Sequence, residues 1–174
     1  MTLKYNNVYL ESTSTVVGPN EHNGPLSRRF DRYYSELYMN EDTFENAEVH
    51  LMKESVDILL DKINKKKKDV ELFIAGDLQN QITSACFTAG YLKVPFIGVY
   101  SACASNVEGL ILASNFIDKG RVNYLVQRAS SHQLSVKSCM GILMSSRYLR
   151  TGLKHQRTET SKNHSPNSSR HLVM

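Results

Sequence analysis

The sequence predicts an α/β fold with a mostly parallel β-sheet. From residue 70 onward, short apolar runs rich in β-branched residues alternate with single segments of helical periodicity. Each helical segment is long enough to carry the chain from the end of one strand to the start of the next. Strands that alternate with single helices pair in parallel through right-handed crossovers, which place helices on both faces of the sheet.

The first long element is an amphipathic helix that begins near residue 44. Thr43 is a suitable N-cap, and the apolar residues after it follow three-and-four spacing as far as residue 63. Four consecutive lysines, Lys65 to Lys68, come next. A solvated loop that complements the negative end of the helix dipole is the favoured interpretation of these lysines, and a patch for phosphate or lipid is the alternative.

The remaining elements are shorter, and Gly120 marks the end of the last helix. Downstream of the lysines, the sequence predicts strands at residues 71–75, 96–100 and 123–129. A helix at residues 83–92 follows the first strand, and a second helix, whose apolar residues run from Val107 to Ile117, follows the second strand. The first 40 residues are less regular. Two strands, at residues 7–11 and 14–17, precede the turn signals Gly18-Pro19 and Gly24-Pro25.

Polar side chains follow three of the predicted strands at the point where each strand ends. Asp77 follows the first strand, Cys103 the second, and Ser131 and His132 the third. In parallel sheets, ligands bind beyond the carboxyl ends of the strands. The sequence therefore predicts that these groups meet at one cavity, with the thiol at its base.

Cys103 stands where a buried strand turns into a helix. Small residues around it permit a tight turn, and the apolar residues of the helix begin at Val107. The positive end of a helix dipole favours a thiolate and bound anions, so the cysteine is a candidate reactive or pocket group. A small apolar thiol also fits a crowded strand-to-helix junction, which is the structural alternative.

Composition narrows the class of function. A chain of 174 residues with three widely spaced cysteines, Cys86, Cys103 and Cys139, indicates neither a disulfide framework nor a zinc site, and no cofactor is predicted. The chain lacks the glycine-rich signatures of dinucleotide and nucleoside triphosphate sites and the G-x-S-x-G elbow. No apolar stretch resembles a membrane span or a signal peptide, so we expect a cytoplasmic start.

The net charge of +4 belongs to one part of the chain. Residues 134–174 hold seven Lys and Arg residues and one acidic residue. The first 133 residues hold 14 Lys and Arg residues and 16 acidic residues. A nucleic-acid partner is therefore not predicted for the folded part.

Longer motifs resemble a known family. The A-C pair at the head of a buried helix is similar to the nucleophile region of the thiolase and ketoacyl-synthase superfamily. The segments GPNEHNGPL, FDRYYSELYMNEDTFENAEVHLM, IAGDLQNQ, VPFIGVYSACASNVEGLILAS and ASSH more closely resemble the SpoVAD family of spore-forming Firmicutes, in order from about Val16 to Gln133.

The resemblance implies a thiolase-like fold without demonstrated thiolase chemistry. It implies action with other SpoVA proteins, peripheral to the developing spore's inner membrane, in the uptake of dipicolinic acid as its calcium chelate. Asp77 and Asn80 fall on the family's GDLxNQ segment, and Cys103 falls on its A-C elbow. Ser131 and His132 fall on the family's SSHN segment, in which Gln133 replaces asparagine. These five residues are the implied ligand-binding set.

The resemblance divides the chain in two. Residues 1–133 are expected to form the N-terminal half of the duplicated thiolase-like fold, and residues 134–174 a non-homologous, basic, disordered tail. A frame-shifted, truncated product of such a gene is the hypothesis for this change in composition, and a natural short paralogue is the alternative. Half of a duplicated fold leaves an apolar face exposed, which predicts aggregation or a homodimer.

Two functions from different classes follow. The first is a non-enzymatic, ligand-binding component that assists dipicolinic acid uptake. The second is an acyltransferase that uses Cys103 as its nucleophile on a thioester. Catalysis ranks second because the residues that activate the cysteine in the enzymatic relatives belong to the second half of the fold.

The frame-shift hypothesis predicts that the nucleotides downstream of codon 133, translated in another frame, encode the second thiolase-like half. Resequencing the locus tests this expectation. An intact frame for residues 134–174, together with peptides from this segment in sporulating cells, would refute it.

Overall fold

Strand β4 (Leu72–Gly76) lies between β6 and the edge strand β5 in a five-stranded sheet in which every neighbouring pair is parallel. The structure, a computed structural model, describes residues 2–131 and the backbone of residues 171–173. The sheet order is β1-β7-β6-β4-β5. The other four strands are β1 (Tyr9–Ser12), β5 (Phe96–Gly98), β6 (Tyr124–Ala129) and β7 (His171–Val173). The α/β fold with a parallel sheet is confirmed.

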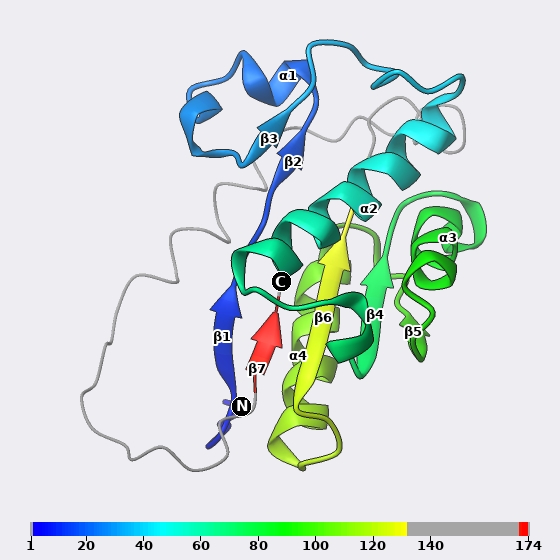
Figure 1. The fold of residues 1–174 in the computed structure, drawn as a ribbon. Helices are drawn as coiled ribbons and strands as arrows, with labels where there is room; N and C mark the ends of the chain where they lie inside the picture. The colour runs from blue at the N-terminus through cyan, green and yellow to red at the C-terminus, as the bar shows by residue number, and fades with distance from the viewer. Residues whose placement is uncertain (1, 132–170, 174) are drawn as a thin grey trace.

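Helices cover both faces of this sheet, so the fold has three layers (Figure 1). Helices α2 (Phe44–Lys62) and α3 (Thr83–Leu92) pack on one face, and α4 (Ser105–Asp118) packs on the other. Residues of β4 alternate between the layers: Phe73 and Ala75 join the core with α2 and α3, whereas Leu72 and Ile74 join the core with α4. Burial on both faces explains why the strand is apolar throughout.

Helix α2 forms where the periodicity predicts it. The hydroxyl oxygen of Thr43 accepts a hydrogen bond from the amide of Asn46 at 3.2 Å, which confirms Thr43 as the N-cap. One stripe of the helix is buried, and it includes Met52, Val56 and Leu59. This stripe, packed against α3 and β6, positions the helix across the sheet.

The N-terminal region differs in part from the prediction. β2 covers only Val16–Val17, and it pairs in parallel with β3 (Arg32–Tyr33) in a separate two-stranded sheet. Between these strands lie α1 (Pro19–His22) and the 3-10 helix η1 (Ser27–Arg29). Propensity alone places a strand but does not identify its partner, which explains the difference.

β7 is a strand that the sequence pattern did not predict. His171–Val173 pairs in parallel with both β1 and β6. On the side away from β4, β6 would have unpaired backbone N–H and C=O groups without β7. Pairing with β7 satisfies them. Composition could not predict this pairing because it joins segments far apart in the sequence.

Two glycines allow close approach between layers and strands. A Cβ atom at Gly76 would lie 2.3 Å from the backbone oxygen of Val99, and one at Gly109 of α4 would lie 2.6 Å from Nε2 of the buried Gln127 on β6. Gly76 therefore permits the tight contact between the end of β4 and the chain that leaves β5.

We predict that Gly76→Ala lowers the free energy of unfolding by about 2 to 3 kcal/mol, because the added methyl group overlaps a backbone atom that cannot rotate away. The matched control is Gly90→Ala in α3, where no atom lies within 4 Å of the position that the added methyl group would take. This control should raise stability by up to about 1 kcal/mol through helix propensity. Urea unfolding of both variants measures the difference, and equal effects would contradict the packing described.

Candidate functional site

Three loops leave the sheet from its carboxyl edge, which is the edge at which β4, β5 and β6 end. The amide of Val99 donates to the carbonyl of Ala75 at 3.0 Å, and the amide of Ser130 donates to the carbonyl of Gly76 at 3.1 Å. The ends of β5 and β6 are therefore fixed on either side of the end of β4. The convergence of these strand ends, predicted from the sequence, is present.

Asp77 is fully buried directly after β4. Its Oδ1 accepts from the amide of Gln79 at 2.8 Å, and its Oδ2 accepts from the amide of Ala85 at 2.7 Å. Burial raises the pKa of this carboxyl group, and hydrogen bonds from the backbone of Ala85, Gln79 and Ser84 oppose that rise. Because both oxygens are engaged, the geometry supports an orienting role: Asp77 holds the first turn of α3 against the end of β4.

The loop between β4 and α3 contains unusual backbone. Asn80 begins the short 3-10 helix η3 (Asn80–Ile82), in which Gln81 and Ile82 have positive φ angles of 57° and 48°. The side chain of Asn80 is exposed. Left-handed conformations at glutamine and isoleucine are strained, and strain of this kind concentrates at functional loops.

Cys103 lies in the 3-10 helix η4 (Ala102–Ala104), immediately before α4. Ala102 has a positive φ of 46°, which marks a sharp turn ahead of the cysteine. The side chain of Cys103 is exposed rather than placed at the base of a cavity, which corrects that expectation. The physical reason is that η4 follows the end of β5 and none of its residues is buried.

The helix that follows Cys103 continues from η4, in which the amide of Ser105 donates to the carbonyl of Ala102. No side chain caps α4, whose N-cap position is Ala104. The amide of Ser101 donates to Oγ of Ser105 at 3.0 Å, and the hydroxyl of Ser101 donates to the carboxylate of Glu108. The first-turn amides of α4 are the groups at this edge best suited to an anionic or carbonyl oxygen.

The loop after β6 is tied to α2 through Ser130. The hydroxyl of Ser130 donates to Oε1 of the fully buried Glu48 at 2.8 Å. Ser131 is exposed, and His132 lies outside the described residues. Neither Ser130 nor Glu48 was predicted as a site residue, although Glu48 falls in phase with the apolar stripe of α2, a position where a carboxylate signals a specific partner.

Gln79 is a further residue that the sequence reasoning missed. Its side chain is buried, its Nε2 donates to the carbonyl of Glu45 at 3.4 Å, and its Oε1 has no partner among the described residues. The amide joins the loop after β4 to the first turn of α2, and only the tertiary structure reveals this contact.

A polar network also lies on the outer side of α2. Nδ1 of His50 lies 2.8 Å from a carboxylate oxygen of Glu41, and Nε2 lies 2.8 Å from the hydroxyl of Tyr34, which donates to Glu54 at 2.7 Å. Arg32 pairs with the other oxygen of Glu54 at 3.1 Å. Burial and the contact with Glu54 raise the pKa of Tyr34 to about 12. These groups satisfy one another and join the segment before α2 to that helix.

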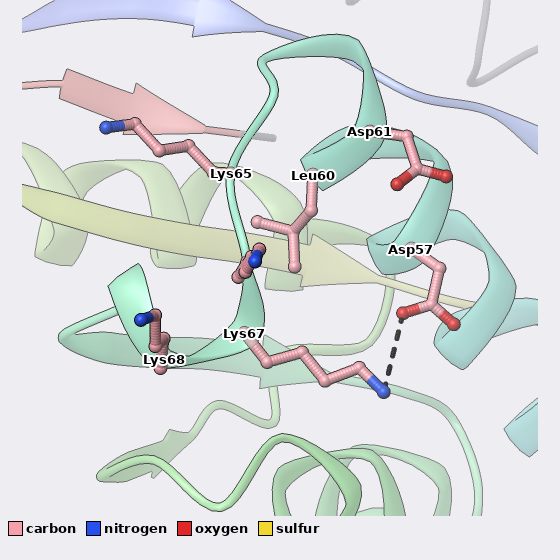
Figure 2. Close-up of a pocket in the computed structure, with 7 residues that line it drawn as sticks. Asp57, Leu60, Asp61, Lys65, Lys67 and Lys68 are labelled. Atoms are coloured by element: carbon pink, nitrogen blue, oxygen red, sulfur yellow. Dashed lines mark ion pairs between the residues drawn. The ribbon is translucent and has the colours of Figure 1, made fainter.

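Two surface pockets lie along α2, away from the predicted site residues. One, of about 460 Å³, borders His50 and Tyr91. The other, of about 390 Å³, lies at the end of the helix beside Lys65 to Lys68 (Figure 2). Neither is lined by Asp77, Asn80, Cys103 or Ser131. The described part of the chain also contains no three His, Cys, Asp or Glu side chains grouped to share a metal ion.

Comparison with known proteins identifies the family. The sequence profile of Stage V sporulation protein AD (SpoVAD) matches residues 1–162. This chain belongs to the SpoVAD family. The match continues past Gln133, where the resemblance seen in the motifs stops, and the frame-shift hypothesis stays a prediction.

Two individual proteins are similar to this SpoVAD family member. Stage V sporulation protein AD of Bacillus subtilis (strain 168) is 36% identical over 130 residues, which are 75% of this chain and 38% of that protein. The crystal structure of 3-oxoacyl-[acyl-carrier-protein] synthase III from Aquifex aeolicus VF5 is similar with a TM-score of 0.44 and 22% identity, over 55% of this chain and 32% of that chain. The chain thus spans well under half the length of its curated relative.

We predict that Asp77→Asn lowers the free energy of unfolding by about 2 to 3 kcal/mol. Both carboxylate oxygens of Asp77 accept from backbone N–H groups, and in asparagine one of them is replaced by an NH2 group, which cannot accept. Asn80→Ala, three residues away and exposed, should change it by less than about 0.5 kcal/mol. Denaturant unfolding measures both. Unchanged stability in the Asp77 variant would remove its orienting role.

Proposed function

We propose that this chain acts as a ligand-binding, non-enzymatic component of the SpoVA system, which assists uptake of dipicolinic acid into the developing spore. Membership of a family of sporulation proteins supports the setting. The observation that carries the proposal is the meeting of three loops at the carboxyl edge, where the uncapped N-terminus of α4 lies beside Cys103.

The proposed ligand site consists of exposed groups on these loops. Asn80, Cys103 and Ser131 lie at the surface, and His132 follows in the sequence. Amide, hydroxyl and imidazole groups donate hydrogen bonds to carboxylate oxygens, and the first-turn amides of α4 supply further donors. Asp77 contributes indirectly, because it holds the loop that carries Asn80.

The calcium chelate fits this edge better than the free dianion. Two carboxylates, Asp77 and Glu48, are buried behind the loops and would repel a ligand with two negative charges. In the one-to-one chelate, calcium neutralises both carboxylates of dipicolinate. The flat aromatic ring then offers apolar surface to neighbours such as Tyr100, which is 58% exposed.

We place the protein at the periphery of the spore's inner membrane with the other SpoVA proteins as partners. Among residues 2–131 and 171–173, every helix is too short or too polar to span a lipid bilayer. Large apolar side chains are exposed on α3, α4 and the loop after β5: Phe87, Tyr100, Val107 and Ile111. Exposed apolar side chains of this kind suit contact with a partner protein or a second copy of this chain.

An acyltransferase is the second candidate, favoured by one observation. An exposed cysteine just before a helix, after a residue with a positive φ angle, is suited to attack a thioester carbonyl. The acyl group forms a bond to the sulfur of Cys103, the carbon–sulfur bond of the substrate breaks, and the substrate's thiol leaves with a proton. The histidines whose side chains the structure describes are engaged elsewhere: His22 stacks on Tyr33, and His50 contacts Glu41 and Tyr34. No described histidine is thus placed as the general base.

We expect calorimetric titration with calcium dipicolinate to give saturable binding. Ser131→Ala should weaken it by about tenfold, because one hydrogen bond to a charged oxygen is lost. Ser35→Ala is the matched control, because it removes an exposed hydroxyl in the segment before α2, distant in sequence from Ser131. This variant should bind normally.

Two outcomes contradict this proposal. Absence of binding heat would remove the ligand. A burst of thiol release from an acyl thioester, abolished by Cys103→Ala, would replace the transport role with the acyltransferase.

A further inference from the structure

The edge of the sheet opposite the candidate site is strongly basic. Because all five strands are parallel, the segments that lead into β1, β4, β5 and β6 meet at the amino edge of the sheet. These segments, residues 2–8, 63–71, 93–95 and 119–123, hold eight Lys and Arg residues and two acidic residues. The rest of residues 2–131 holds six Lys and Arg residues and fourteen acidic residues. These four segments therefore carry a net positive charge, although Asp57 and Asp61 near the end of α2 line the same pocket as the lysines. Asp118, at the end of α4, accepts from the backbone amide of Asn6 at 3.0 Å.

The two acidic residues within these four segments, Asp69 and Glu71, accept hydrogen bonds from backbone and side-chain amide groups. Oδ2 of Asp69 accepts from the amide of Lys66 at 2.8 Å. Glu71 accepts from the backbone amide of Asn123 at 3.2 Å and from its side-chain amide at 3.1 Å. Both carboxylates shape the loops, and neither forms an ion pair with a lysine amino group among the described residues.

The lysine loop lies at the centre of this edge. Nζ of Lys67 lies 3.8 Å from Asp57 and 3.3 Å from the centre of the Tyr91 ring. Figure 2 shows Lys65 and Lys68 extending to the side away from Asp57. Within the described residues, Lys65, Lys66 and Lys68 form no ion pair, and Lys66 and Lys68 are exposed.

The chemistry of this edge disfavours two kinds of ligand. A small bound anion would sit against the carbonyl end of α2, where the helix dipole is negative. Nucleic acid is commonly held by arginine forks and aromatic stacking, whereas here seven of the eight cations are lysines. The two aromatic rings nearby already contact lysines of this chain: Nζ of Lys65 lies 4.4 Å from the centre of the Tyr124 ring, and Nζ of Lys67 lies over Tyr91.

An extended anionic surface satisfies both constraints. Lysines are flexible point charges that reach outward, and several together are attracted to anionic lipids. Leu3, 52% exposed beside Lys4 in the segment before β1, adds an apolar side chain at the same edge. Basic side chains with an exposed leucine match the chemistry of a bilayer interface.

We propose that the amino edge is a docking surface for an anionic lipid bilayer, with Lys65, Lys66 and Lys68 at its centre. The inference rests on the membrane location in the proposed function. It adds an orientation: the carboxyl edge with Cys103 faces away from the bilayer, so the ligand site stays accessible.

Co-sedimentation of the full chain with vesicles tests this surface. The vesicles contain phosphatidylcholine with or without phosphatidylglycerol, at low and high salt. We expect binding only with phosphatidylglycerol and weakening as salt rises. The triple variant Lys65→Gln, Lys66→Gln, Lys68→Gln should bind about 100-fold more weakly, since each lysine near the surface contributes about a factor of five.

The matched control removes the same charge elsewhere. Arg28→Gln, Arg29→Gln, Lys53→Gln should bind vesicles within about threefold of the parent chain, because long-range attraction changes little when the docking lysines remain. Equal losses in the two variants, full binding by the lysine variant, or a preference for duplex DNA over vesicles at matched salt would overturn the proposal.

Calorimetry of the same lysine variant separates this inference from the proposed function. The substitutions lie at the opposite edge from Ser131, so calcium dipicolinate should titrate normally. If the parent chain does not bind vesicles but binds calcium dipicolinate normally, the docking surface alone is refuted. Normal vesicle binding without ligand heat refutes the ligand site alone.

Discussion

The pairing of β4 with parallel strands on both sides is the constraint on which the rest of the structure depends. The carbonyls of Ala75 and Gly76 accept from Val99 and Ser130, so the ends of three strands lie in register. Gly76 permits this contact because any side chain there meets the backbone of Val99. Every loop that carries a candidate site residue leaves from this edge, and every loop of the basic surface enters at the other.

Buried polar groups then fix the loops at the carboxyl edge. Asp77 holds the start of α3, and Glu48 of α2 holds the loop after β6 through Ser130. A buried carboxylate is costly unless it is hydrogen-bonded, so these two contacts specify one loop arrangement. The anchors lie behind, while Asn80, Cys103 and Ser131 lie at the surface. This division separates the groups that position the site from those suited to contact a ligand.

The sequence predicted the parts of the fold that depend on local pattern. Helix α2, its Thr43 cap, and the alternation of strands and helices after residue 70 are encoded in periodicity and capping chemistry, which act over a few residues. β7 was missed because its pairing with β1 and β6 joins segments distant in sequence. The contact between Glu48 and Ser130 is likewise non-local, although a carboxylate in the apolar stripe of α2 was a readable signal. The exposure of Cys103 depends on what covers η4, which no pattern around the cysteine encodes.

Protection of Cys103 from alkylation tests the central claim, that the carboxyl edge is the ligand site. Cys86 on α3 is also exposed, and its thiol lies 3.8 Å from the carbonyl of Gln81 in the loop that carries Asn80, so it reports on the same edge. Peptide mass spectrometry after timed alkylation gives both rates with and without calcium dipicolinate. The account predicts that the ligand slows modification of Cys103 in proportion to occupancy, and that it slows Cys103 more than Cys86. Equal rates with and without ligand at Cys103, at concentrations that saturate binding, would contradict it.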